Sequence, residues 1–176
     1  YILSYNGAKI INCKTNEVIY EKFVPDEIKE TVYDISKKYG INILTYENDA
    51  IITENSDRFI EIESKINHMH VKIVKSFIEA LKFPVIKYLM TGEPAVLEKI
   101  EPLVYKKLSG YGNVFRSEPF FLEVVPENLD KAASMNVFLQ ALGSDRTELI
   151  ACGDGFNDKS MIEFAGLGVA MENAQK

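Results

Sequence analysis

The chain has 176 residues, 47% of them hydrophobic, and a formal net charge of -6 at neutral pH. This length and composition suit a globular protein with a buried core, either one domain or a core with an inserted domain. The acidic balance argues against nucleic acid as a general partner, because binding a phosphate backbone needs a basic face.

Two further features concern the compartment. No apolar run approaches the roughly 20 residues that a membrane span needs, and no signal-peptide pattern stands at the start of the chain, so no membrane partner is predicted. Cys13 and Cys152 lie in strand-like apolar contexts far apart in the sequence. They are therefore predicted to be reduced and to fill the core, which fits a cytoplasmic protein.

The first third of the chain reads as strands followed by a helix. Residues 1–3 form a strand pattern that ends in a tight turn at Asn6 and Gly7, and residues 9–23 predict a hairpin. From Pro25 the apolar spacing becomes helical, and Gly40 stands where a helix over 26–39 would end.

The middle of the chain continues with mixed elements. The patterns predict strands over 41–46, 50–53, 85–90 and 113–116, and helices over 57–66 and 94–108. Residues 68–81 are ambiguous and read as helical towards their end, while Thr91 is a plausible helix start with Pro94 in the first turn. Residues 12–118 are thus predicted to be a compact α+β unit, with a size that suits an inserted domain.

The last third alternates strand and helix. A strand over 120–125 leads through a connection to Lys131, and a helix follows with Met135 and Leu139 on its apolar face and Gly143 at its end. A strand over 148–152, a turn, a second helix and a strand over 168–171 complete the pattern. This alternation is typical of a parallel α/β sheet.

An acidic turn follows the strand over 148–152. Gly153 and Gly155 allow a sharp turn there, so that Asp154, Asn157 and Asp158 project beyond the carboxyl end of the strand, where open α/β sheets bind ligands. Carboxylate and amide oxygens suit Mg2+ and a phosphate ligand. The alternative is an ordinary turn in which Asp and Asn only cap a helix.

Lys131 together with the turn Gly-Asp-Gly-Phe-Asn-Asp over 153–158 resembles the haloacid dehalogenase superfamily of phosphohydrolases. The run from Asn6 through a long α+β insertion to residues 120–131 is similar to its Cof-type phosphatases, which carry a cap of the C2B type. The resemblance implies a partial Rossmann-like parallel-sheet core, made by residues 1–11 and 119–176, around an inserted α+β cap at residues 12–118.

The family's opening strand, with Asp-x-Asp-Gly, and its strand ending in Thr or Ser are absent from this sequence. Tyr1 is therefore expected to follow both motifs, and Lys176 to precede the closing elements of the core. The resemblance implies Mg2+-dependent hydrolysis of a small phosphomonoester, such as a sugar phosphate, through an aspartyl-phosphate whose nucleophile lies before Tyr1.

The resemblance also implies a role for each remaining site residue. Asp154 would bind Mg2+, with Asp158 as a second-shell or water-mediated metal partner. Lys131 would neutralise phosphate oxygens, and Asn157 would donate a hydrogen bond to them. Asn6 would line the boundary between core and cap, although Asn before Gly is also an ordinary turn choice.

Two alternatives stay open. The chain could belong to another branch of the superfamily, a phosphoserine phosphatase or a phosphomutase, although the position of the long insertion speaks against the former. It could instead be a non-catalytic binding module, if the native chain begins at Tyr1. The sequence makes no prediction of oligomeric state.

Overall fold

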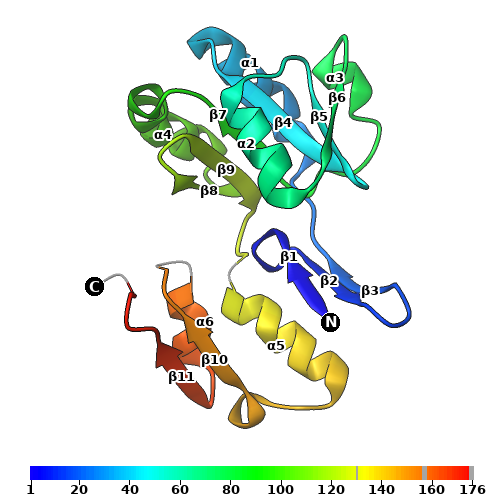
Figure 1. Cartoon of the computed structure of the whole chain (residues 1–176), viewed down its shortest axis with the longest axis vertical. Helices are drawn as coiled ribbons and strands as arrows, with labels where there is room; N and C mark the ends of the chain where they lie inside the picture. Colours follow the sequence, from blue (N-terminus) through cyan, green and yellow to red (C-terminus); the bar gives the residue numbers. More distant parts are fainter. Residues whose placement is uncertain (130, 156–157, 175–176) are drawn as a thin grey trace. The chain divides into compact units, whose positions relative to one another are not determined.

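A computed structural model describes residues 1–129, 131–155 and 158–174 (Figure 1). The chain divides into two compact units. Tyr1–Lys22 and Asn128–Lys176 form the first, which we call the terminal unit, and Phe23–Glu127 forms the second, which we call the central unit. Within the described ranges, no helix combines the length and the apolar character needed to cross a bilayer.

The central unit is built on a six-stranded mixed sheet with the order β6-β5-β4-β7-β9-β8. Only the β5–β6 pair is parallel, and the other neighbours are antiparallel. The strands are β4 Asn42–Glu47, β5 Ala50–Thr53, β6 His70–Ile73, β7 Tyr88–Thr91, β8 Gly112–Glu118 and β9 Phe121–Pro126.

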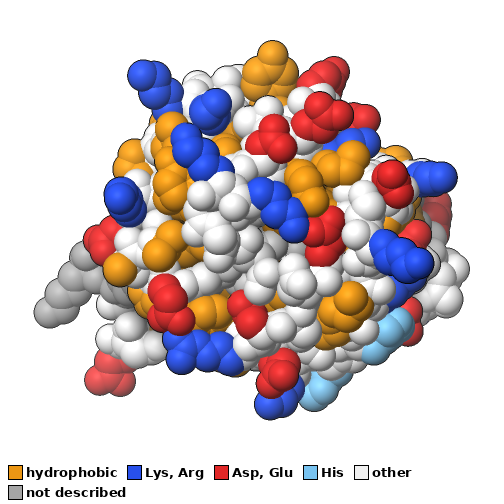
Figure 2. All heavy atoms as spheres, turned by 90° about the horizontal axis from the view of Figure 1, so that it is seen from above, with side chains coloured by type: hydrophobic (Ala, Val, Ile, Leu, Met, Phe, Trp, Pro, Cys, Tyr) orange, Lys and Arg blue, Asp and Glu red, His pale blue; other side chains and the backbone are white. Residues whose placement is uncertain are grey.

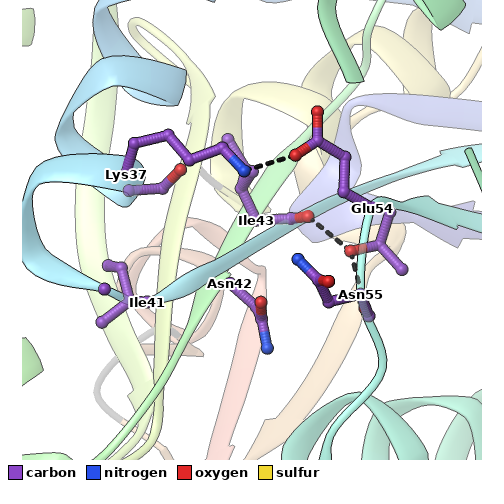
Figure 3. A pocket seen from close by; sticks show the side chains of 9 residues that line it. Lys37, Ile41, Asn42, Ile43, Glu54 and Asn55 are labelled. Atoms are coloured by element: carbon purple, nitrogen blue, oxygen red, sulfur yellow. Dashed lines mark hydrogen bonds and ion pairs between the residues drawn. The ribbon is translucent and has the colours of Figure 1, made fainter. Parts of the chain in front are cut away.

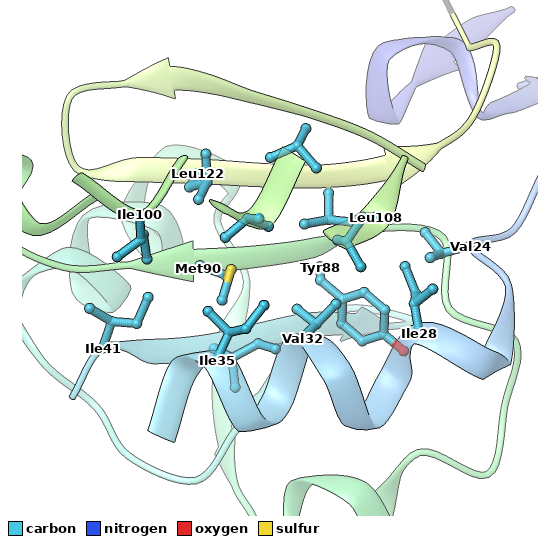
Figure 4. Packing of buried hydrophobic residues seen from close by; sticks show 14 of the residues in the cluster. Val24, Ile28, Val32, Ile35, Ile41, Tyr88, Met90, Ile100, Leu108 and Leu122 are labelled. Atoms are coloured by element: carbon cyan, nitrogen blue, oxygen red, sulfur yellow. The ribbon is translucent and has the colours of Figure 1, made fainter. Parts of the chain in front are cut away.

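Helices complete the central unit: α1 Lys29–Tyr39, α2 Arg58–Asn67, α3 Phe77–Ala80 and α4 Pro94–Leu108, with a short 3-10 turn η2 at Asp26–Ile28. Val32 and Ile35 of α1 pack towards Tyr88 and Met90 of β7 in one hydrophobic cluster (Figure 4). Gly40 ends α1 with a left-handed φ of 63°, as the sequence predicted.

The segment over 68–81, which the sequence left ambiguous, holds both kinds of element. Its end is helical as predicted, at Phe77–Ala80, whereas His70–Ile73 is a strand because the edge of β5 takes it as a parallel partner, with Ala50 opposite His70. One local prediction is wrong. Thr91 lies within β7, and Glu93 rather than Thr91 is the residue before α4. At Ile73, which the apolar spacing assigned to the helical part, sheet pairing overrides that spacing.

The strand predicted over 120–125 does form, but it does not join a parallel sheet. As β9, it lies between β7 and β8 and is antiparallel to both. The borders between the two structural units lie at residues 22/23 and 127/128. The sequence pattern suggested domain borders at 11/12 and 118/119. The interpretation of the central unit as a cap remains a proposal.

The terminal unit combines two small sheets. β1 Ile2–Ser4, β2 Lys9–Asn12 and β3 Glu17–Glu21 form an antiparallel sheet, with a 3-10 turn η1 at Tyr5–Gly7 between the first two strands. β10 Ile150–Gly153 and β11 Leu167–Ala170 are parallel and are connected by α6 Lys159–Phe164. α5 Lys131–Leu142 contacts both α6 and η1.

The predicted hairpin, the α5 helix and the parallel strand-helix-strand segment are confirmed. The two cysteines are free, but the prediction that they fill the core is wrong, since both are exposed. Cys13 follows the end of β2, and Cys152 lies on an exposed side of β10. On the face of the molecule in Figure 2, the described positive and negative side chains are interspersed.

Candidate active site

An ion pair joins the two motifs that the sequence singled out. Lys131 is the first residue of α5, and Asp158 is the residue before α6. The Lys131 Nζ donates a hydrogen bond to Asp158 Oδ1. Asp158 is buried, with 8% of its surface exposed. The fold therefore brings together two charged residues that are 27 positions apart.

The other carboxylate oxygen of Asp158 holds the acidic turn. Asp158 Oδ2 accepts hydrogen bonds of 3.1 Å from the backbone N–H groups of Asp154 and Gly155. The hydrogen bond from Lys131 lowers the pKa of Asp158; burial opposes this, and the two backbone donors reinforce it. Asp158 is consequently an ionised anchor for both the lysine and the turn.

Gly153 is required by the position of Asp158. A Cβ atom at residue 153 would lie 2.4 Å from Asp158 Cβ and 2.8 Å from Asp158 Oδ2. Real side chains do not approach so closely, and the atoms that a Cβ would meet include Asp158 Cβ, which is tied directly to the backbone. The glycine thus allows the carboxylate to lie against the end of β10.

Asp154 has a different environment from Asp158. It is exposed, and its Oδ2 accepts a hydrogen bond of 2.8 Å from Asn173 Nδ2. The sequence analysis did not identify Asn173. Its position after a predicted strand could have indicated it, because Asn173 follows β11 and the carboxyl ends of neighbouring parallel strands meet at one edge of a sheet.

A cavity of about 330 Å3 lies beside the lysine within the terminal unit. Lys131, Asn6 and Ser134 line it, together with the apolar side chains of Leu3, Met135 and Met161. Asn6 adopts the left-handed conformation, with φ 57° and ψ 26°. The structure therefore brings Asn6 and Lys131 to one cavity, whereas Asp154 and Asp158 are not among its lining residues. Asn157 lies outside the described residues.

The carboxylates of Asp154 and Asp158 can be compared as ligands for the predicted Mg2+ ion. Both oxygens of Asp158 are already bonded to Lys131 or to backbone N–H groups, so the exposed carboxylate of Asp154 is the better placed of the two for a cation. In the described part of the chain, no group of three His, Cys, Asp or Glu side chains could hold a metal. Asp154 fits Mg2+ as one ligand of a larger set.

Comparison with known proteins connects these features to a family. The family model described as haloacid dehalogenase-like hydrolase matches residues 1–176. A solved structure of a haloacid dehalogenase-like hydrolase from Bacteroides thetaiotaomicron is 45% identical, with a TM-score of 0.95, and the match covers 99% of this chain and 66% of that chain.

Two more distant matches agree. The structure of the HAD subclass IIB sugar phosphatase BT4131 is 25% identical, with a TM-score of 0.78, covering 98% of this chain and 64% of that chain. The Bacillus subtilis protein YxeH is 29% identical over 178 residues, which are 99% of this chain and 65% of that protein. This chain thus spans slightly less than two thirds of the length of these relatives.

The family inferred from Lys131 and the turn over 153–158 is confirmed by a match over the whole chain and by the agreement in fold. The α/β architecture of this chain is therefore that of a known hydrolase family. The chain belongs to the haloacid dehalogenase-like hydrolase family.

Proposed function

We propose that this chain carries the phosphate-binding part of the active site of a Mg2+-dependent hydrolase of small phosphomonoesters. The observation that carries the proposal is the ion pair of Lys131 with the buried Asp158, at the edge of a cavity that Asn6 also lines. A cation held at the start of a helix beside a cavity suits the binding of a phosphate group.

Lys131 neutralises phosphate oxygens as negative charge develops on them in the transition state. Its side chain is 30% exposed and lines the cavity, so a substrate in the cavity would lie against it. Asp158 acts on Lys131 and on the turn by positioning them, because both of its oxygens are engaged in hydrogen bonds. Its role as a metal partner, predicted from the resemblance, would be indirect, through a bound water.

Asp154 binds Mg2+ in this proposal, and Asn173 orients its carboxylate through the hydrogen bond to Oδ2. A Mg2+ ion would supply charge neutralisation and polarisation of the phosphoryl oxygens. Asn157, outside the described residues, is proposed to donate a hydrogen bond to the phosphate. The remaining metal ligands are proposed to come from residues other than these 176.

The attacking group is proposed to be an aspartate outside the 176 residues, which forms an aspartyl-phosphate that water then hydrolyses. The substrate class is proposed to be sugar phosphates or similar metabolites, supported by the likeness to a structure titled as a sugar phosphatase. The central unit is proposed to be the cap that selects the leaving group.

The test uses the native full-length protein, with release of phosphate from p-nitrophenyl phosphate and from a panel of phosphorylated sugars. We expect activity with Mg2+, its loss on chelation and its return when Mg2+ is added. Asp154→Asn should lower kcat at least about 100-fold, whereas the exposed Asp49→Asn should leave it unchanged.

Full activity of Asp154→Asn would overturn the metal assignment. The absence of phosphate release from every substrate by the native protein would favour the alternative, a non-catalytic binding module. An intact-mass measurement of the native protein establishes beforehand whether further residues accompany the 176.

A further inference from the structure

A second cavity, of about 500 Å3, lies in the central unit, and none of its lining residues belongs to the candidate active site. Leu81, Phe83 and Val85 supply apolar surface to it, and Tyr88 lines it from β7. The wall is fixed by main-chain bonding, because the N–H of Val24 donates to the carbonyl of Val85 at 2.8 Å. This cavity is large enough for a small organic molecule.

Tyr88 is the unusual residue of this cavity. It is 1% exposed, and its ring packs against that of Phe77, with 6.3 Å between the ring centroids. Figure 4 shows the ring extending from β7 towards α1, beside Ile28. Among the residues that the structure describes, none forms a hydrogen bond with its hydroxyl, and the hydroxyl oxygen is not among the fully enclosed polar atoms.

A hydroxyl in an apolar environment is stabilised by a hydrogen-bond partner. The Tyr88 side chain lines a cavity in which a ligand or water can accept a hydrogen bond from its hydroxyl. Burial, and to a lesser extent the charge of Asp26, raise the pKa of Tyr88. The hydroxyl therefore stays protonated at neutral pH and is available as a hydrogen-bond donor.

The charged residues around this cavity favour an anion. Lys29 is paired with Asp26 at 2.9 Å, so the charges of these two lining residues balance. Lys82 also lines the cavity and is exposed, and no acidic side chain of the described residues forms an ion pair with it. The three charged residues together leave one positive charge at the cavity.

A smaller cavity in the same unit provides a contrast. Its volume is about 210 Å3, and its lining includes Lys37 and Glu54, which are paired with each other (Figure 3). Glu54 accepts two further hydrogen bonds, from Tyr33 Oη at 2.9 Å and from the Phe77 N–H at 2.7 Å. Both ionic side chains of this smaller cavity are paired, whereas in the Tyr88 cavity Lys82 forms no ion pair with the described residues.

We propose that the Tyr88 cavity binds a small organic anion, with its charged head between the Tyr88 hydroxyl and the Lys82 ammonium group and its apolar body against Leu81, Phe83 and Val85. The head is an oxyanion, either a carboxylate or a phosphate-like group. The proposal does not depend on the phosphatase assignment, since no residue of the Lys131 site takes part.

The test is an NMR titration of the full-length protein with three probes of similar size: phenylacetate, phenylphosphonate and the neutral phenylacetamide. We expect the two anions, or one of them, to bind in the millimolar range or tighter and to shift the amide signals of residues 81–88. The comparison of the two anions identifies the preferred head, and phenylacetamide should bind more weakly than either anion that binds.

Two variants examine the named contacts. Tyr88→Phe keeps the ring and should weaken anion binding roughly 10-fold, because it removes a hydrogen bond to a charged group. Lys82→Gln should weaken it about three- to fivefold and reduce its dependence on salt, as expected for an exposed charge. Lys107→Gln, which changes an exposed lysine at the end of α4, is the matched control and should bind as the original protein does.

Lys131→Met distinguishes anion binding at the Tyr88 cavity from anion binding at the candidate active site. Binding at the Tyr88 cavity should persist in this variant. The proposal is overturned if no anion binds at about 10 mM. It is equally overturned if the amide binds as tightly as the anions, or if Tyr88→Phe and Lys82→Gln both retain the original affinity. Thermal melting of Tyr88→Phe checks that its core is intact.

Discussion

At the scale of single residues, Asp158 organises the candidate active site. One carboxylate oxygen holds Lys131, and the other holds the backbone of the acidic turn at Asp154 and Gly155. A buried carboxylate with three donors is well compensated for the loss of water. In the proposed function its effect on chemistry is therefore indirect, and Lys131 and Asp154 are the groups proposed to meet the substrate and the metal.

Lys131→Met tests the role of the lysine. We expect kcat of the full-length enzyme to fall by about 100- to 1,000-fold, because one preorganised charge opposite the phosphate is lost. The free energy of unfolding should fall by about 1–3 kcal/mol, because Asp158 remains buried without its cation. Steady-state kinetics and urea denaturation measure both effects, and Lys14→Gln is the control at an exposed turn. An unchanged kcat would contradict the assignment.

Gly153→Ala tests the packing of the turn against β10. The added Cβ would meet Asp158 Cβ at 2.4 Å, so either the strand or the carboxylate must move. We expect a loss of about 1–3 kcal/mol in stability, as for other overpacked sites, and a marked loss of activity. Cys152→Ala, at the neighbouring exposed position, should affect neither. A variant with the original melting temperature and activity would contradict this prediction, since it would show that the turn accommodates the added Cβ with no loss of stability.

At the scale of elements, Glu54 connects three segments of the central unit. It follows β5, it accepts hydrogen bonds from Tyr33 and Lys37 of α1, and it accepts another from the N–H of Phe77 at the start of α3. Burial acts to raise the pKa of Glu54, but the hydrogen bonds from Lys37, Phe77 and Tyr33 outweigh burial, and the pKa is lowered.

Because the pKa is lower in the folded state, ionised Glu54 stabilises the central unit above the pKa of an unfolded glutamate, about 4.3. This stabilisation is lost as the pH falls through the lower, folded pKa. Glu54→Gln should therefore cost about 1–3 kcal/mol at pH 7, and the difference from the original protein should shrink below about pH 4.

The measurement is chemical denaturation at several pH values, followed through NMR signals of the buried Val32 and Ile35. Glu61→Gln, on the exposed side of α2, is the control and should show no such pH dependence. A Glu54→Gln difference that stays constant from pH 7 to pH 3 would contradict the prediction.

At the scale of the whole molecule, the central unit contains a complete hydrophobic cluster. Every residue of this cluster, from Val24 to Val124, lies within Phe23–Glu127. The unit also pairs all six strands of its sheet internally. A segment with its own core and its own sheet has what it needs to fold independently.

A fragment of residues 23–127 should therefore fold by itself, with a dispersed NMR spectrum and a single cooperative unfolding transition. A fragment of residues 12–118, with the borders suggested by the sequence pattern, lacks β9 and should not fold. In the sheet β7 and β8 each pair with β9 and not with each other, so the fragment loses both pairings. Urea denaturation should show that the 23–127 fragment is the more stable of the two. A well-folded 12–118 fragment would contradict it.

The sequence by itself determined the family and most of the elements. The turn over 153–158, Lys131 before an apolar helical pattern, and the helix stop at Gly40 are local signals, because turn geometry and helix capping depend on residues close in the chain. The family match over residues 1–176 confirms the interpretation of these motifs.

Only the tertiary structure decided how distant residues meet. The pairing of β9 with β7 and β8, the recruitment of residues 70–73 as a strand and the hydrogen bond from Asn173 to Asp154 depend on partners at sequence separations that no periodicity encodes. The same holds for Tyr88, which reads as an ordinary strand residue. Its burial and its place in the lining of a cavity are created by the fold as a whole.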